Sequence, residues 1–250
     1  MAVKISTITV VLNGAATIRD CIESVQIQTH PPEHIIIDGG STDGTLDIIN
    51  EYPQISQIIS EPDNGIYDAM NKGIGLATGD VVGILNADDI YADSNILSKV
   101  AKAFESESIN ACYGDLIYVN PTHPDQVDRW WRSGEYRPNR FYWGWMPPHP
   151  TFFVQKSVYD RYGYFNPALG SSADYELMLR LLLKYRIRPA YIPEVLIQMR
   201  TGGISNVSIK NRLLANRNDR LAWKVNGIKP CPWTLWLKPI RKIPQYFKKP

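Results

Sequence analysis

The sequence is poor in cysteine and lacks every arrangement in which cysteines bind zinc or build a disulfide framework. Its 250 residues include three cysteines, Cys21, Cys112 and Cys231, which are scattered and form no C-x-x-C pair. Structural zinc sites need clustered Cys and His ligands, and disulfide frameworks need even numbers of cysteines. We therefore expect neither, and we predict a protein of the reducing cytoplasm.

Long apolar runs are also missing. No stretch reaches the roughly 18 uninterrupted apolar residues that a transmembrane helix needs, and the apolar segment 5–12 is broken by Ser6, Thr7 and Thr9. Its β-branched composition is typical of a buried strand and not of a signal peptide. We expect a chain that does not span a membrane.

Two common glycine-rich nucleotide motifs are absent as well. The sequence contains no G-x-x-x-x-G-K-[ST] phosphate loop. The glycines of segment 73–79 have the wrong spacing for a dinucleotide fingerprint, and they close a predicted helix instead of opening one after a strand. P-loop and nicotinamide chemistry are thereby excluded.

What is present is an alternation of strands and helices. Strands are predicted at 8–12, 35–37, 55–60, 81–85 and 111–119, and residues at helical spacing fill most of the intervals. This pattern predicts an α/β fold with a mostly parallel sheet and helices on both faces.

The alternation breaks at segment 120–150, which is rich in proline and tryptophan and which we predict to be a binding surface or lid. A short strand, 151–154, and a helix near 157–162 are expected next. An apolar helix at about 174–185 and an extended segment at 189–200 complete the prediction.

Polar residues directly after predicted strands are the first candidates for a site, because ligands bind beyond the carboxyl ends of parallel strands. Asn13, Asp38 and the pair Asp88 and Asp89 hold such positions. The two adjacent carboxylates would repel each other unless a cation lay between them, which favours Mg²⁺ or Mn²⁺ bridging to phosphate. A strand-to-helix turn at Asp38 and helix capping by the aspartate pair are the alternatives.

Two further residues are candidates in the second half of the chain. Asp174 precedes an apolar helix and is either a general base for an acceptor hydroxyl or an acid that favours the helix dipole. His149 lies in a frame of prolines and is either a phosphate or acceptor contact or a structural histidine.

Several motifs together resemble family 2 glycosyltransferases. The segments that carry the resemblance are 9–13, 37–45, 61–73, 77–80 and 86–89, in that order. Segment 61–73, Glu-Pro-Asp-Asn-Gly-Ile-Tyr-Asp-Ala-Met-Asn-Lys-Gly, is especially similar to bacterial members of the colanic-acid, O-antigen and exopolysaccharide type.

The resemblance implies a GT-A fold in residues 1–207, with a Rossmann-like donor half at about 1–119 and an acceptor half at about 120–207. It implies inverting transfer of a sugar from a nucleotide-diphosphate-sugar donor to a saccharide or lipid-linked saccharide acceptor. A divalent metal, Mg²⁺ or Mn²⁺, would be the cofactor, and bacterial surface polysaccharide synthesis the setting.

The resemblance also implies residue roles. Asp88 and Asp89 would bind the metal and the donor diphosphate, and Asp174 would be the catalytic carboxylate. The remaining donor-binding residues would be Asn13, Asp38, Asp63, Asn71, Lys72 and Asn86. The acceptor or closing-loop residues would be His149, Gly203 and Ser205. Gly39 stands where many members have a second aspartate, so the base contact falls to Asp38 or to Asp63, and Asn86 stands where many have the first acid of the metal motif.

Residues 208–250 form a separate basic segment. They contain eleven Lys or Arg and one acid, Asp219, interleaved with Trp, Leu and Ile. This composition favours attachment to an anionic membrane surface, here the cytoplasmic face of the inner membrane. Nucleic-acid binding and a solvated tail are the alternatives, and we expect no nucleic-acid partner.

Two other functions compete with the glycosyltransferase prediction. A sugar nucleotidyltransferase shares the layered fold, but segment 13–16 lacks the Gly-rich, Arg- and Lys-bearing loop that such enzymes carry after the first strand. A non-catalytic nucleotide-sugar-binding or scaffold subunit is the other candidate, and the presence of Asp88, Asp89 and Asp174 argues against it.

Overall fold

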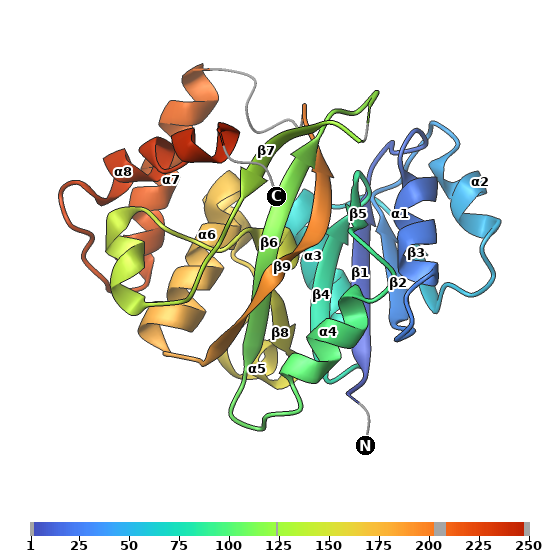
Figure 1. Cartoon of the computed structure of the whole chain (residues 1–250). Helices are drawn as coiled ribbons and strands as arrows, with labels where there is room; N and C mark the ends of the chain where they lie inside the picture. Colours follow the sequence, from blue (N-terminus) through green and yellow to red (C-terminus); the bar gives the residue numbers. More distant parts are fainter. Residues whose placement is uncertain (1–2, 124, 203–208, 248–250) are drawn as a thin grey trace.

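The computed structural model describes residues 3–123, 125–202 and 209–247. A nine-stranded mixed sheet forms its centre, with the order β3-β2-β1-β4-β8-β6-β9-β5 and with β7 paired to β6 (Figure 1).

The elements of the first half are β1 (Ile5–Val11), α1 (Ile18–Gln26), β2 (Glu33–Asp38), α2 (Thr45–Asn50), β3 (Gln57–Ser60), α3 (Ile66–Leu76), β4 (Val81–Asn86), β5 (Asp89–Tyr91), α4 (Ile96–Ala103) and β6 (Ala111–Val119). The elements that follow are β7 (Val127–Trp131), η1 (Pro138–Trp143), η2 (His149–Thr151), β8 (Phe153–Gln155), α5 (Lys156–Tyr162), η3 (Pro167–Ser172), α6 (Ala173–Met178), the π-helix η4 (Leu179–Lys184), β9 (Pro189–Arg200), α7 (Ile209–Val225), α8 (Thr234–Ile240) and η6 (Ile243–Tyr246).

The predicted α/β architecture is confirmed, including the strand at 111–119 and the extended segment at 189–200. Strands β3, β2, β1 and β4 are parallel neighbours, so their carboxyl ends lie at one edge of the sheet. The antiparallel strand β8 then joins β4 to β6. This edge is where the polar residues predicted from the sequence come together.

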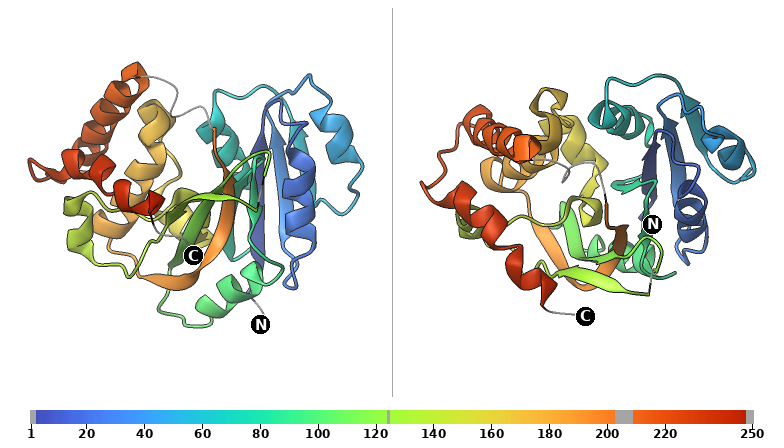
Figure 2. Two further views of the ribbon diagram at one scale, coloured as in Figure 1. Left: turned by 45° about the horizontal axis from the view of Figure 1, so that its top comes forward. Right: turned by 90° about the horizontal axis from the view of Figure 1, so that it is seen from above.

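Helices cover both faces of the sheet (Figure 2). Helix α3 packs on one face through Met70 and Ile74, whereas α1 packs on the other through Ile18 and Ile22. Gly73 allows the close approach of α3, because a Cβ at this position would lie 2.3 Å from Ile8 Cγ2. Burial of these aliphatic side chains is the main stabilising contribution to the layered structure.

Segment 120–150, predicted to be a binding surface or lid, contributes several side chains to the core, and a binding role of its exposed part stays a prediction. It contains β7 and η1, and Phe141 and Trp145 are 0% and 3% exposed. Their rings meet edge to face at 5.2 Å, and the Trp145 indole N–H donates to the Ser133 carbonyl at 2.8 Å. A buried tryptophan needs such a partner, and only the folded chain reveals it.

The C-terminal helices α7 and α8 pack against α6 and η1. Trp223 on α7 is 0% exposed, and its indole N–H donates to the Tyr175 hydroxyl at 3.0 Å. Thr234, at the start of α8, donates to the Tyr142 carbonyl at 2.7 Å. In the described part of the chain, no helix combines the length and the apolarity that crossing a bilayer requires.

Candidate active site

The loops after β1 and β2 are joined at the carboxyl edge of the sheet. Val11 lies opposite Asp38 in the ladder between these strands. Asn13 adopts the left-handed conformation, with φ of 52°, which asparagine tolerates better than most residues. Its side-chain oxygen accepts from the Thr42 N–H at 2.9 Å, and its own N–H donates to Ser41 Oγ at 2.7 Å. The two loops therefore form one surface.

Asp38 lies beneath this surface and is 0% exposed. Its carboxylate accepts from the Ser41 N–H at 3.1 Å and from the Ser60 hydroxyl at 2.6 Å. These bonds satisfy a buried carboxylate and fix the loop. A contact between Asp38 and the nucleotide base stays a prediction.

Asp63 reaches the space beside Gly39. A Cβ on Gly39 would lie 3.3 Å from Asp63 Oδ2, so the absence of a side chain at position 39 leaves room for this carboxylate. The other oxygen, Oδ1, lies 2.6 Å from the Lys72 ammonium, which is also 2.8 Å from Glu61. The two carboxylates raise the pKa of Lys72. Two predicted donor-site residues, Asp63 and Lys72, thus form an ion pair.

The candidate metal site consists of Asn86, Asp88 and Asp89. Asp89 is 0% exposed and accepts a hydrogen bond of 3.0 Å from the Asn86 amide. Burial and the neighbouring charge of Asp88 raise the pKa of Asp89 well above its usual value. The remaining buried oxygens, Asn86 Oδ1 and Asp89 Oδ1, have no hydrogen-bond partner.

These oxygens fit a hard divalent cation. Within the described residues, no group of three or more His, Cys, Asp or Glu is arranged to hold a metal by itself. Mg²⁺ is usually held by one or two carboxylates and completed by water and substrate phosphates. Asp88, Asp89 and the Asn86 carbonyl oxygen match that donor set, and a cation would relieve the repulsion between the two acids.

Arg200 is a candidate that the sequence analysis missed. It ends β9, where Met199 lies opposite Asp89. Its guanidinium forms an ion pair with Asp20 of α1, and its positive charge opposes the upward shift of the Asp89 pKa. The buried Nη1 atom has no hydrogen-bond partner. No local pattern marks this arginine, because its position depends on the pairing of β5 with β9.

The predicted base, Asp174, lies in the first turn of α6 and is partly buried. Tyr67 of α3 lies within electrostatic reach of Asp174 and packs on Phe165, with ring centres 5.4 Å apart. Burial, followed by the charge of Asp174, raises the pKa of Tyr67. The Asp174 carboxylate itself accepts from the Tyr175 N–H at 2.7 Å.

His149 lies near this pair. Its ring meets Phe165 edge to face at 5.6 Å, and its buried Nε2 atom has no hydrogen-bond partner. Burial lowers the pKa of His149, and the charge of Asp174 opposes this shift only in part. A neutral imidazole with an unpartnered nitrogen is suited to contact an acceptor hydroxyl.

Asn71 is bonded to the backbone of Phe165. Its amide donates to the Phe165 carbonyl at 3.0 Å and accepts from the Phe165 N–H at 2.9 Å. Both polar groups of the side chain therefore join α3 to the segment before α6, and a contact between Asn71 and the donor stays a prediction. The predicted closing-loop residues Gly203 and Ser205 lie outside the described residues.

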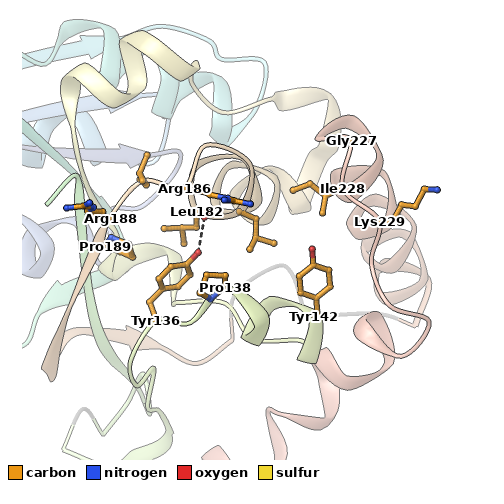
Figure 3. Close-up of a pocket in the computed structure, with 12 residues that line it drawn as sticks. Tyr136, Pro138, Tyr142, Leu182, Arg186, Arg188, Pro189, Gly227, Ile228 and Lys229 are labelled. Carbon is orange, nitrogen blue, oxygen red and sulfur yellow. Dashed lines mark hydrogen bonds between the residues drawn. The ribbon is translucent and has the colours of Figure 1, made fainter. Parts of the chain in front are cut away.

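A cavity of about 940 Å³ lies apart from these residues, between η1, η4 and the turn after α7 (Figure 3). Tyr136, Tyr142 and Leu182 form part of its wall, and none of the candidate donor, metal or catalytic residues lines it. This cavity is therefore separate from the candidate active site.

The sequence of the chain is similar to those of known proteins. The family model described as glycosyl transferase family 2 matches residues 6–163. A PGL/p-HBAD biosynthesis glycosyltransferase of Mycobacterium tuberculosis is 31% identical over 210 residues, which cover 81% of this chain and 79% of the relative. An uncharacterized glycosyltransferase of the same species is 30% identical over 209 residues, covering 82% and 78%.

Solved structures match the fold. S. aureus TarS in complex with UDP-GlcNAc has a TM-score of 0.65 at 17% identity, and the match covers 86% of this chain and 66% of that one. Mannosyltransferase PcManGT from Pyrobaculum calidifontis, in complex with GDP-Man and Mn²⁺, has a TM-score of 0.66 at 18% identity, covering 98% and 70%. With a family model over more than half of its length and a relative 31% identical over 81% of it, the chain belongs to glycosyltransferase family 2 and is a nucleotide-sugar-dependent glycosyltransferase.

Proposed function

We propose that the chain is an inverting glycosyltransferase of bacterial surface polysaccharide synthesis, with a saccharide or lipid-linked saccharide as acceptor. The observation that carries this proposal is the separation of the acids into two groups. Asn86, Asp88 and Asp89 lie where β4 ends and β5 begins, whereas Asp174 lies at the start of α6 near His149 and Tyr67. Such an arrangement suits a donor on one side and an acceptor on the other.

On the donor side, Asn86, Asp88 and Asp89 would hold Mg²⁺ or Mn²⁺. The ion would neutralise negative charge on the leaving diphosphate when it is bound. Arg200 adds a fixed positive charge close to Asp89. Asn13 and Asp63 lie on neighbouring loops of the same edge and would contact the nucleoside.

On the acceptor side, Asp174 would accept the proton of the attacking hydroxyl. The acceptor oxygen bonds to the anomeric carbon while the bond from that carbon to the diphosphate breaks, and the nucleoside diphosphate leaves. A single displacement of this kind inverts the anomeric centre. Double displacement would require a second carboxylate as nucleophile, and among the described residues Asp174 is the acid whose charge acts on both Tyr67 and His149.

Peripheral attachment to the cytoplasmic face of an anionic membrane is part of the proposal. Apolar side chains of α8 and η6 are exposed, with Trp236 at 69%, Ile243 at 55% and Phe247 at 83%. An exposed apolar cluster flanked by basic residues is typical of a surface that rests on an anionic lipid headgroup layer.

The reaction is tested by following product release from UDP-, GDP- and dTDP-sugars with Mg²⁺ or Mn²⁺. We expect metal-dependent release of nucleoside diphosphate from one donor, at least tenfold slower in Asp88→Asn, because the substitution removes a charged metal ligand. Asp47→Asn, an exposed site on α2, is the matched control. Release of inorganic pyrophosphate would identify a nucleotidyltransferase. Failure to bind or turn over any donor, with an acceptor mixture present, would favour a scaffold subunit.

A further inference from the structure

The cavity between η1, η4 and the turn after α7 has a mostly aliphatic wall (Figure 3). Its volume of about 940 Å³ lies in the range of cavities that bind small molecules. The aliphatic side chains of the wall are Leu182, Leu183, Ile187 and Ile228. Among the described residues that line the cavity, none is Asp, Glu, Asn, Gln, Ser or Thr. Apart from two tyrosine hydroxyls, the uncharged part of the wall therefore offers no polar side chain to a ligand.

The two tyrosines of the wall are held in place by contacts outside the cavity. The Tyr136 hydroxyl donates to the Leu182 carbonyl at 2.8 Å (Figure 3), and its ring centre lies 5.9 Å from that of Trp145. The Tyr142 ring centre lies 5.2 Å from that of Trp223. Both tryptophans are buried in the core. The wall is therefore formed before any ligand arrives, which reduces the cost of ordering it on binding.

Three cations complete the lining: Arg186, Arg188 and Lys229. All three side chains are exposed, so they lie where the cavity meets solvent. Within the described residues, no ion pair joins any of them to an acid. Figure 3 shows Arg188 and Lys229 on opposite sides of the cavity, with Arg186 between them in this view. The cavity thus combines an apolar wall with positive charge at its opening.

Arg186 has a backbone conformation that favours another residue type. It follows η4, which ends at Lys184, and adopts the left-handed conformation with φ of 53°. The next N–H, that of Ile187, donates to the Leu181 carbonyl at 3.1 Å. Glycine is the usual residue at such a helix end. An arginine held in a disfavoured conformation beside a cavity indicates that its side chain has a role there.

We propose that this cavity is a second ligand site, which binds an anionic amphiphile with its alkyl chain against the aliphatic wall and its head group at Arg186. Burial of an alkyl chain against aliphatic side chains is favourable, and arginine forms strong charge-assisted hydrogen bonds with anionic oxygens. A sugar or a nucleobase would bury polar groups that the wall leaves without partners, which is unfavourable. The inference does not depend on the reaction at the candidate active site, because the cavity is separate from it.

Binding of decyl phosphate to the full chain tests the site without any turnover. Isothermal titration calorimetry, below the micelle concentration, would compare decyl phosphate with decanol and with inorganic phosphate. We expect decanol and inorganic phosphate to bind at least tenfold more weakly, because each lacks one of the two contacts.

Arg186→Gly separates the side chain from the fold. We expect it to weaken decyl phosphate binding at least tenfold while thermal unfolding occurs at the same temperature or higher, because glycine suits the left-handed conformation. Arg186→Lys should retain binding. Lys184→Gln, which removes an exposed charge two residues away that does not line the cavity, is the matched control and should bind like the unaltered chain.

Unchanged binding to Arg186→Gly, or an equal loss in Lys184→Gln, would overturn the site. Decanol binding as tightly as decyl phosphate would show that the anionic head contributes nothing, and inorganic phosphate binding as tightly would overturn the amphiphile. Trp236→Ala, at an exposed residue of α8 outside the cavity lining, should leave binding unchanged. A loss in this variant as large as in Arg186→Gly would place the ligand on the C-terminal surface and not in the cavity.

Discussion

The Asn71 side chain bonds to both backbone groups of Phe165 and thereby connects α3 to the segment that precedes α6. Tyr67, one turn earlier on α3, packs on the Phe165 ring with ring centres 5.4 Å apart and lies within electrostatic reach of Asp174. One face of α3 therefore contacts the segment that leads to the candidate base.

Replacing Tyr67 by Phe should lower kcat/KM for transfer by about tenfold, because it removes a polar group close to the candidate base, and about 1.4 kcal/mol of transition-state stabilisation corresponds to tenfold in rate. Tyr185→Phe, at a partly exposed tyrosine that stacks on Tyr162, is the control. Equal losses in the two variants would contradict a specific role of the Tyr67 hydroxyl beside Asp174.

His34 should make the fold less stable as the pH falls from 7 to 5. Burial within the sheet lowers the pKa of His34 to about 4, and its Nε2 atom is 3.0 Å from the Thr9 hydroxyl. The unfolded chain takes up a proton near pH 6.5, whereas the folded chain does so near pH 4, so stability is lost between these values. At pH 5 the loss is about 2 kcal/mol.

Urea denaturation at pH 7 and pH 5 measures this loss, and His34→Gln should reduce it. His149, whose pKa is also lowered by burial, contributes in the same direction. Glu33 affects stability at lower pH than the histidines do. Its pKa is about 2 in the folded chain, so its contribution to stability is lost only below about pH 4.5. An unchanged pH dependence in His34→Gln would contradict the assignment.

The sequence was sufficient to predict the layered sheet and the edge at which the candidate polar residues lie, because β-branched runs and the polar residues that follow them are local signals. Asp38 and Asn86 end β2 and β4, the two neighbours of β1, and Asn13 lies two residues beyond the end of β1. Local signals did not reveal that Asp38 is saturated by Ser41 and Ser60, since those bonds depend on three-dimensional loop positions.

Pairing and packing between distant segments explain the features that the sequence did not predict. Arg200 comes close to Asp89 through the pairing of β5 with β9, and Tyr67 comes close to Asp174 through the packing of α3 on Phe165. Aromatic residues in a proline-rich segment such as 120–150 are equally consistent with a core and with a binding surface or lid. The folded chain shows that Phe141 and Trp145 belong to the core.

Replacing Arg200 by Gln should lower the free energy of unfolding by about 1–3 kcal/mol, because it removes the positive charge close to the buried Asp89. Asp20→Asn, which breaks the ion pair on the exposed side, should cost less than about 1 kcal/mol. Thermal and urea unfolding without metal would measure both. Equal effects of the two substitutions would show that Asp20, and not Asp89, is the important partner.

The C-terminal helices should contribute to stability through the side chains that they bury against the rest of the fold. Trp223→Ala should lower the free energy of unfolding by about 3–5 kcal/mol, because the side chain is 0% exposed and bonded to Tyr175. Trp236→Ala, at a residue 69% exposed, should change it by less than about 0.5 kcal/mol. Similar losses in both variants would contradict the packing of α7 and α8 described above.

The exposed aromatic side chains of the C-terminal segment should control membrane attachment without affecting the fold. The double substitution Trp236→Ala and Phe247→Ala removes two of the most exposed aromatic side chains of the segment. We expect co-sedimentation with vesicles of phosphatidylcholine and phosphatidylglycerol to fall at least fivefold, because each ring contributes apolar area to the interface. Ile27→Ala, an exposed apolar site on the C-terminal end of α1, is the control and should leave sedimentation unchanged.

Vesicles of phosphatidylcholine alone should bind more weakly than the mixed vesicles, because each basic residue near an anionic surface contributes about 1 kcal/mol. Equal binding to both kinds of vesicle would leave the apolar contact in place but remove the basis for an anionic partner.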